Sequence, residues 1–171
     1  MIELKVLQAV RLKGRIAPDG IADTVGEEPA LVAEAVSAAS AAGLLIEGKA
    51  VRLSPEGRTR LSELLAAERA KADQDAIAAA YDKFRGVNAD FKALVSDWQL
   101  RNGEPNPHDD AEYDSAVLAR LADVHDRVMP VNAAIVAEIP RLAGYSDKLD
   151  AALAKVNAGE TSWLTRPIVD S

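Results

Sequence analysis

The chain has 171 residues, of which 20 are Lys or Arg and 27 are Asp or Glu, so its formal net charge is −7. The hydrophobic fraction of 49% suffices for a buried core, and the charged fraction of 27% argues against a wholly disordered chain. The sequence has no cysteine, which excludes a disulfide framework, a thiolate metal site and a cysteine nucleophile. Its only histidines are His108 and His125, which is too few for most catalytic triads and histidine-rich metal sites. We therefore expect no enzyme, catalytic residue, metal or cofactor.

No apolar run approaches the ~20 residues that a membrane span needs, and no signal segment opens the chain. We therefore expect a cytoplasmic protein without a membrane partner. Apolar residues lie close to the end of the sequence at Trp163, Leu164, Ile168 and Val169. Either this tail docks on the preceding helices or the natural chain continues beyond Ser171.

The first seventy residues predict a small domain of helices with one hairpin. Apolar residues recur at helical spacing, proline stands at the first position of several segments, and glycine follows their ends. Ser54 and Pro55 form a good cap and first turn for the last of these helices. The expected elements are helices over residues 2–13, 18–25 and 29–42, a hairpin of residues 44–46 and 51–53, and a helix that begins at Pro55.

Helix, helix, turn, helix, hairpin and helix is the order of a winged helix-turn-helix. The segments AAGLLIEG and RLSPEGRTRLSELL resemble the helix stop, the wing and the L-T-P-x-G-R entry of the MarR-type transcriptional regulators. The resemblance covers about residues 1–70 and implies a regulator that binds duplex DNA as a homodimer. The wing is short here and lacks the Asp-x-Arg tip of that family.

In the sequence, Lys and Arg residues suited to phosphate contacts both precede and follow the predicted third helix. The outward face of that helix carries Ser37. The candidate DNA-binding residues are Arg11, Lys13, Arg15, Ser37, Lys49, Arg52, Arg58 and Arg60. Between Ile16 and Gly48, however, there is no Lys or Arg, and the third helix presents Glu28 and Glu34. Because carboxylates repel phosphates, a winged-helix module that binds proteins instead of DNA is the alternative.

The second half, residues 71–171, predicts an antiparallel helical bundle, which makes the fold mainly α. A heptad seam with spacings of 4 and 3 marks a helix that begins near Ala66 or Gln74 and ends at Leu100. Its members are Ile77, Tyr81, Phe84, Asn88, Phe91, Val95 and Trp98. A second seam includes Val117, Leu121, Val124 and Val128, after which Pro130 starts or kinks a continuation, and a last helix ends at Gly159.

The helical half contains two candidate pocket residues, each with a plainer interpretation. Asn88 and Trp98 could line a ligand pocket, whereas a buried Asn also fixes helix register and a Trp also fills a core. His108 with the acidic residues 109–114 has a metal-like composition, but acidic residues also complement the positive end of a helix.

The stretches AAAYDKFRGVNADFKALVSDWQLRNG and WLTRPIVDS are similar, more loosely, to helical segments of bacterial proteins associated with pyruvate phosphate dikinase. That similarity implies a regulatory or interaction domain of a phosphotransfer system. Two hypotheses follow from the sequence. One is a DNA-binding regulator whose helical half dimerises or senses a ligand, and the other is a module that binds a protein partner and no DNA.

Overall fold

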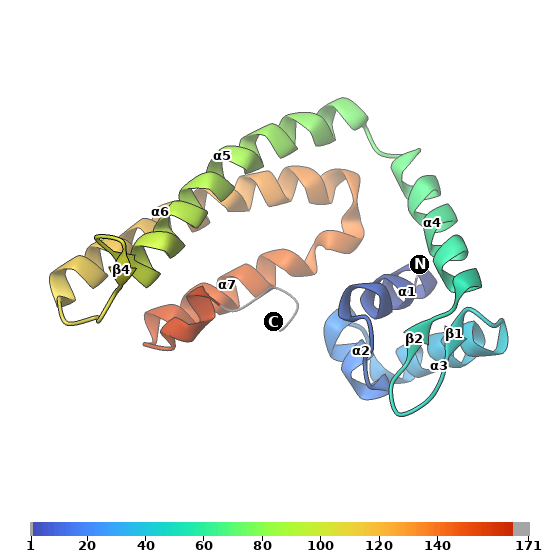
Figure 1. The fold of residues 1–171 in the computed structure, drawn as a ribbon. Helices are drawn as coiled ribbons and strands as arrows, with labels where there is room; N and C mark the ends of the chain where they lie inside the picture. Colours follow the sequence, from blue (N-terminus) through green and yellow to red (C-terminus); the bar gives the residue numbers. More distant parts are fainter. Residues whose placement is uncertain (1, 166–171) are drawn as a thin grey trace. The chain divides into compact units, whose positions relative to one another are not determined.

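The computed structural model describes residues 2–165. The chain divides into two compact units, Met1–Lys71 and Ala72–Ser171, which we call the winged-helix unit and the helical unit. Helices dominate both units, and each unit carries one two-stranded antiparallel sheet (Figure 1). The expected mainly α fold class is therefore confirmed. Within the described range, no helix is both long and apolar enough to cross a membrane.

The winged-helix unit has the element order that its sequence predicts. Its elements are α1 (Ile2–Lys13), α2 (Pro18–Val25), α3 (Pro29–Ala41), β1 (Leu45–Ile46), β2 (Arg52–Leu53) and α4 (Pro55–Arg69). Leu45 pairs with Leu53 and Ile46 with Arg52 in the antiparallel hairpin. An additional bridge joins Ile16, in the connection from α1 to α2, to Val51. This bridge adds a third extended segment to the hairpin, which the sequence analysis did not predict.

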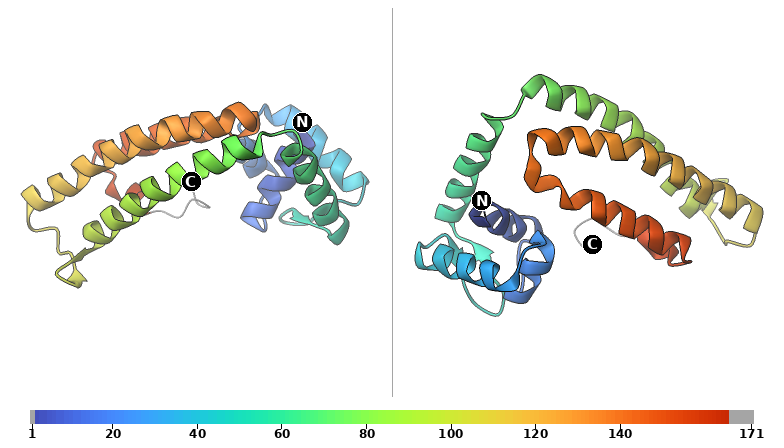
Figure 2. Two further views of the ribbon diagram at one scale, coloured as in Figure 1. Left: turned by 90° about the horizontal axis from the view of Figure 1, so that it is seen from above. Right: turned by 180° about the vertical axis from the view of Figure 1, so that it is seen from behind.

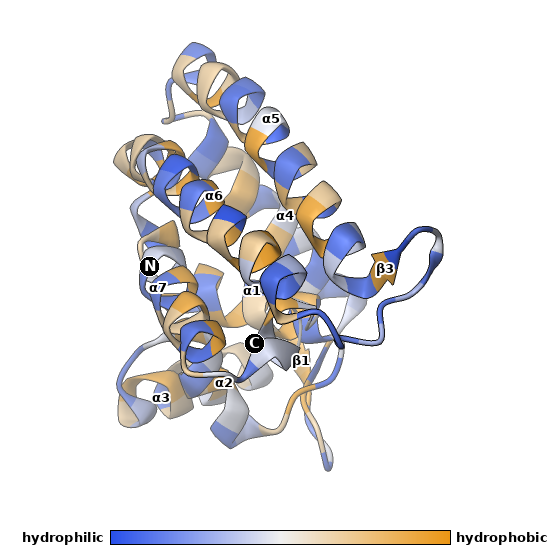
Figure 3. Cartoon of the chain, turned by 90° about the vertical axis from the view of Figure 1, so that its left-hand side faces the viewer, coloured by the Kyte–Doolittle hydropathy of each residue, from blue (hydrophilic) through white to orange (hydrophobic). Residues whose placement is uncertain are grey.

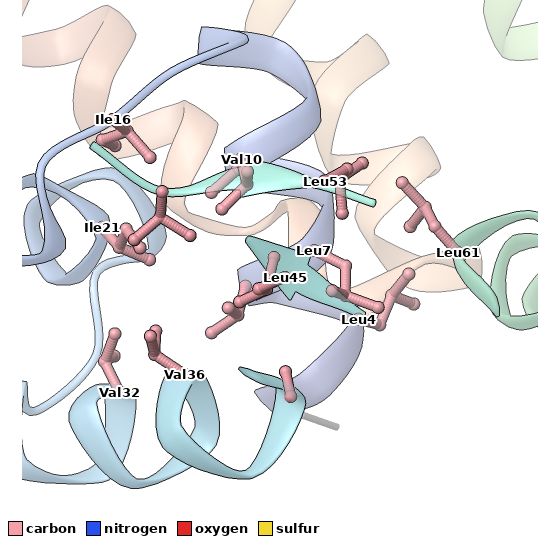
Figure 4. Packing of buried hydrophobic residues seen from close by; sticks show 14 of the residues in the cluster. Leu4, Leu7, Val10, Ile16, Ile21, Val32, Val36, Leu45, Leu53 and Leu61 are labelled. Atoms are coloured by element: carbon pink, nitrogen blue, oxygen red, sulfur yellow. The ribbon is translucent and has the colours of Figure 1, made fainter. Parts of the chain in front are cut away.

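One apolar core holds the winged-helix unit together (Figure 4). Leu7 of α1, Ile21 of α2 and Val32 of α3 are buried, and they belong to the same cluster as the hairpin residues Leu45 and Leu53. Burying a side chain of this size contributes about 1.5–3 kcal/mol. The apolar faces of the three helices and the buried residues of the hairpin thus form a single cluster.

The start of α4 is fixed against the end of α3 by Ser54. Its hydroxyl donates to the carbonyl oxygen of Gly43 at 2.7 Å, and its Oγ accepts the amide hydrogen of Gly57 at 2.9 Å, which caps α4. Gly57 lies against the backbone of Leu44. A Cβ added at Gly57 would stand 2.0 Å from the carbonyl oxygen of Leu44. The glycine therefore permits a close approach that no other residue allows.

The helical unit consists mainly of two long antiparallel helices, α5 and α6, which lie side by side in both Figure 1 and Figure 2. Its elements are α5 (Gln74–Gln99), β3 (Leu100–Arg101), β4 (Glu104–Pro105), α6 (Ala111–Glu138), η1 (Pro140–Leu142), α7 (Gly144–Asn157) and η2 (Thr161–Leu164). Pro130 lies inside α6, so the segment expected to start or kink there is one continuous helix. Leu164 is buried beside Leu94, and Trp163 packs at the edge of that cluster. Residues 166–171, which include Ile168 and Val169, lie outside the described range.

The buried stripe of α5 differs by one position from the predicted seam. Ala80, Val87 and Leu94 are the buried residues of this helix, whereas Tyr81 is 58% exposed. The a and d positions of the heptad are thus 77, 80, 84, 87, 91, 94 and 98, with Ala80, Val87 and Leu94 buried at d. In Figure 3, hydrophobic and hydrophilic residues alternate around α5, as on an amphipathic helix. The predicted seam is therefore wrong at Tyr81, which is exposed.

Gly57→Ala should destabilise the winged-helix unit by about 3 kcal/mol or more, because overpacking against a backbone carbonyl cannot be relieved by a rotamer change. Gly86→Ala is the matched control. Gly86 is exposed in the middle of α5 with no atom within 4 Å of an added Cβ, so the same change should stabilise the protein by about 1 kcal/mol. Urea unfolding followed by circular dichroism measures both. Equal effects at the two sites would contradict the close approach at Gly57.

Candidate anion-binding site

A hollow of about 680 Å³ lies on the surface of the winged-helix unit. Its floor is apolar and its rim is basic. It is lined by Val10, Arg11, Gly14, Arg15, Arg52, Leu53, Arg58, Leu61, Ser62, Leu65 and Arg69. The volume falls in the range of about 300–1,000 Å³ that is usual for ligand sites. We call these residues the arginine hollow.

Three local structures bring the basic side chains of the arginine hollow together. Arg11 lies in the last turn of α1, and Arg58 lies in the first turn of α4 after the Ser54 cap. The antiparallel bridge pairs Ile16 with Val51, so the neighbouring residues Arg15 and Arg52 lie opposite each other. Arg11 and Arg58, which are 47 positions apart in the chain, are thus gathered around one surface by the core beneath it.

No described residue forms an ion pair with Arg11, Arg15, Arg52 or Arg58, and all four are exposed. Other arginines of the chain have partners. Their ion pairs join Arg60 to Glu3, Arg85 to Asp82, Arg101 to Asp110, Arg120 to Asp97 and Arg127 to Asp90. Like charges opposite one another in a sheet destabilise it, so an anion in the hollow would relieve a local repulsion.

The candidate DNA-binding residues therefore separate into two groups. Arg11, Arg15, Arg52 and Arg58 line the hollow, whereas Lys13, Ser37, Lys49 and Arg60 lie outside it. The guanidinium of Arg60 donates two hydrogen bonds to the carboxylate of Glu3, at 2.9 and 3.2 Å. These hydrogen bonds raise the pKa of Arg60 above its usual value. Arg60 is thus committed to joining α4 to α1.

The outward face of α3 carries no cation. Glu28, Leu31 and Glu34 are exposed there, with Leu31 44% accessible, and Ser37 is also exposed. The nearby Glu27 is held by Lys5, whose hydrogen bond lowers the pKa of that carboxyl. Neither Glu28 nor Glu34 forms an ion pair with a described residue. The basic surface of this unit is therefore separate from the helix that enters the major groove in helix-turn-helix proteins.

In the helical unit, the two candidate pocket residues lie far apart. Asn88 is half-buried on α5, about 15 Å along the helix from Trp98 at 1.5 Å per residue. The Trp98 ring packs on the His108 ring, with centroids 4.4 Å apart. Neither Asn88 nor Trp98 lines the arginine hollow. Trp98 therefore belongs to the packing of the turn between α5 and α6.

Polar groups close that turn around Asn106, which is 9% exposed. Its amide donates to the backbone oxygen of Trp98 and to the Oδ1 of Asp114, both at 3.1 Å, while the Nδ1 of His108 lies 2.9 Å from the Oδ2 of Asp114. Asp110 caps α6 through the amide hydrogen of Tyr113 and binds Arg101, and in that order these contacts lower the pKa of its carboxyl. The acidic residues after His108 thus start a helix. Nowhere between residues 2 and 165 do three His, Asp or Glu side chains gather as metal ligands would.

Comparison of the chain with known proteins gives no match to a protein family, to a curated protein or to a solved structure.

Multivalent anions should stabilise the winged-helix unit through the arginine hollow. Inorganic pyrophosphate should raise the thermal midpoint more than sodium chloride of equal ionic strength, because a ligand that binds only the folded state stabilises it. Arg15→Gln plus Arg52→Gln should remove most of this difference. Lys83→Gln plus Lys92→Gln, which removes the same charge from exposed positions of α5, should leave it intact. An equal response in both double variants would rule out the hollow as the anion site.

Stability at low pH should depend on Asp110. Because the folded state lowers its pKa, the ionised carboxyl stabilises the fold above its usual pKa of 3.8, and this contribution is lost as the pH falls through the lower, folded value. Asp110→Asn keeps a capping oxygen but does not titrate. Urea unfolding between about pH 5 and about pH 2 should therefore show a smaller loss of stability in the variant than in the wild type. Identical pH profiles would mean that Asp110 makes no such contribution.

Proposed function

We propose that the winged-helix unit binds the phosphate backbone of duplex DNA through the arginine hollow, as the DNA-contacting part of a transcriptional regulator. The observation that carries the proposal is the convergence of Arg11, Arg15, Arg52 and Arg58 on one surface with no ion-pair partner among the described residues. The resemblance of the segments at 41–48 and 52–65 to MarR-type regulators supports the same function.

Electrostatics favours phosphate as the ligand of this surface. Arginine binds phosphate oxygens through paired N–H groups, and neutralising phosphates supplies most of the affinity of non-specific DNA binding. The whole chain has a net charge of −7 and so repels DNA on average. Attraction must therefore be local, and the hollow is where unpaired cations are concentrated.

Recognition through this surface should depend little on base sequence. Base edges are read by donors and acceptors that a helix or ribbon carries into a groove, commonly Arg, Lys, Asn or Gln. The exposed face of α3 has none of these, and Glu28 and Glu34 would meet phosphates if α3 entered the major groove. The hollow contacts the phosphate backbone of the DNA. The helical unit serves dimerisation or the sensing of a ligand.

A second candidate function is a module that binds a protein partner and no DNA, for instance in a phosphotransfer system. It is favoured by the exposure of Leu31 at 44% between two carboxylates on α3. An exposed leucine of this kind suits a protein surface better than a DNA groove.

The test is binding of the full chain to a random-sequence duplex pool at several salt concentrations. Each neutralised phosphate contributes about −0.9 to the slope of log K against log salt, so four arginines predict a slope of about −3.6. Arg11→Gln plus Arg58→Gln should reduce the slope to about −1.8.

Two controls address the residues outside the hollow. Ser37→Ala, on α3, and Arg60→Gln, which removes a guanidinium already bound to Glu3, should each leave the slope almost unchanged. Absence of binding at low salt would contradict DNA binding and favour the protein-binding module. Loss of binding in Ser37→Ala with no effect of Arg11→Gln plus Arg58→Gln would place the contact on α3 instead of the hollow.

A further inference from the structure

The acidic face of α3 has a shape and charge of its own. Glu28, which immediately precedes α3, and Leu31 and Glu34 of α3 follow one another three residues apart, so Leu31 lies between the two carboxylates. The two glutamates lie about 9 Å apart along the helix axis at 1.5 Å per residue. We call these three residues the α3 ridge.

The arginine hollow has the reverse arrangement. Its floor is formed by apolar side chains of α1, β2 and α4, including Leu61 and Leu65, and arginines surround that floor. No residue of α3 lines the hollow, so the ridge of one molecule does not occupy its own hollow. A ridge with a leucine flanked by carboxylates therefore complements a hollow with an apolar floor flanked by guanidinium groups.

We propose that the α3 ridge of one molecule docks in the arginine hollow of a second copy of this chain. Leu31 covers the apolar floor, and Glu28 and Glu34 pair with arginines of the rim, in the place where phosphates bind under the proposed function. Carboxylate and guanidinium groups form paired hydrogen bonds, which fix the orientation of the contact. The contact is heterologous, because the two surfaces differ. Self-association thereby competes with DNA for the same arginines.

Charge reversal tests the contact in the full chain. The ridge variant is Glu28→Lys plus Glu34→Lys, and the hollow variant is Arg52→Glu plus Arg58→Glu. Sedimentation equilibrium at low salt across the micromolar range should show self-association of the wild type. Association of each double variant alone should be weaker than that of the wild type by about tenfold or by a larger factor, because like charges then face each other.

Mixing the two variants should restore association, because the reversed ridge of one then fits the reversed hollow of the other. The quadruple variant should self-associate again for the same reason. Asp23→Lys plus Glu47→Lys, which reverses two exposed carboxylates outside the ridge, should associate like the wild type. Circular dichroism shows that each variant is folded before its association is compared.

Two results would overturn the proposal. One is a wild-type chain that stays monomeric, and the other is association that is equally strong in both reversed variants and their mixture. The proposed DNA function fails separately, because the ridge variant keeps its hollow intact. Duplex binding is measured on Glu28→Gln plus Glu34→Gln, which removes the ridge charges without adding a cation to α3 and so reports on the hollow even where no self-association occurs.

Discussion

The bridge between Ile16 and Val51 is the constraint on which the basic surface depends. Two backbone hydrogen bonds form it, from the Ile16 amide to the Val51 oxygen at 3.2 Å and from the Val51 amide to the Ile16 oxygen at 2.8 Å. Both side chains belong to the apolar core beneath the hairpin. The alternation of an extended chain then turns their neighbours, Arg15 and Arg52, to the outside. Burial of two aliphatic side chains thus holds two unpaired cations side by side.

The same fold separates the charges of the winged-helix unit. Cations lie where α1 ends, where the hairpin returns and where α4 begins, whereas α3 presents carboxylates and alanines. Arg60 differs from Arg11, Arg15, Arg52 and Arg58, because its guanidinium pairs with Glu3 and joins α4 to α1. A surface of unpaired arginines costs stability in the free protein. Such a cost is compatible with a surface whose function is to bind an anion.

The sequence predicted the winged-helix unit well because its signals are local. Proline at the first helical positions, the Ser54 cap and glycine after helix ends each act within a few residues. The gathering of Arg11, Arg15, Arg52 and Arg58 could be predicted only in part, as a list of candidates. Their common surface depends on the Ile16–Val51 bridge, a long-range pairing that no short motif encodes.

In the helical unit, the sequence did not indicate which of two stripes on α5 packs against α6. The prediction followed the aromatic residues of α5 and placed Tyr81 and Asn88 in the seam. In the structure, α6 packs against Ala80, Val87 and Leu94 instead. Both stripes have heptad spacing, and periodicity alone does not distinguish them. The stripe of Ala80, Val87 and Leu94 is buried, which leaves the ring of Tyr81 on the exposed side of α5.

The most direct test of the arginine hollow is a nuclear magnetic resonance titration of the full chain with duplex DNA at low salt. The side-chain Nε–H signals of arginine and the backbone amide signals of α3 would be followed together. Binding through the hollow predicts that Arg11, Arg15, Arg52 and Arg58 shift with a common affinity while Ala30 and Ser37 stay in place. Shifts confined to α3, with the four arginine signals unchanged, would contradict the hollow as the site of DNA contact.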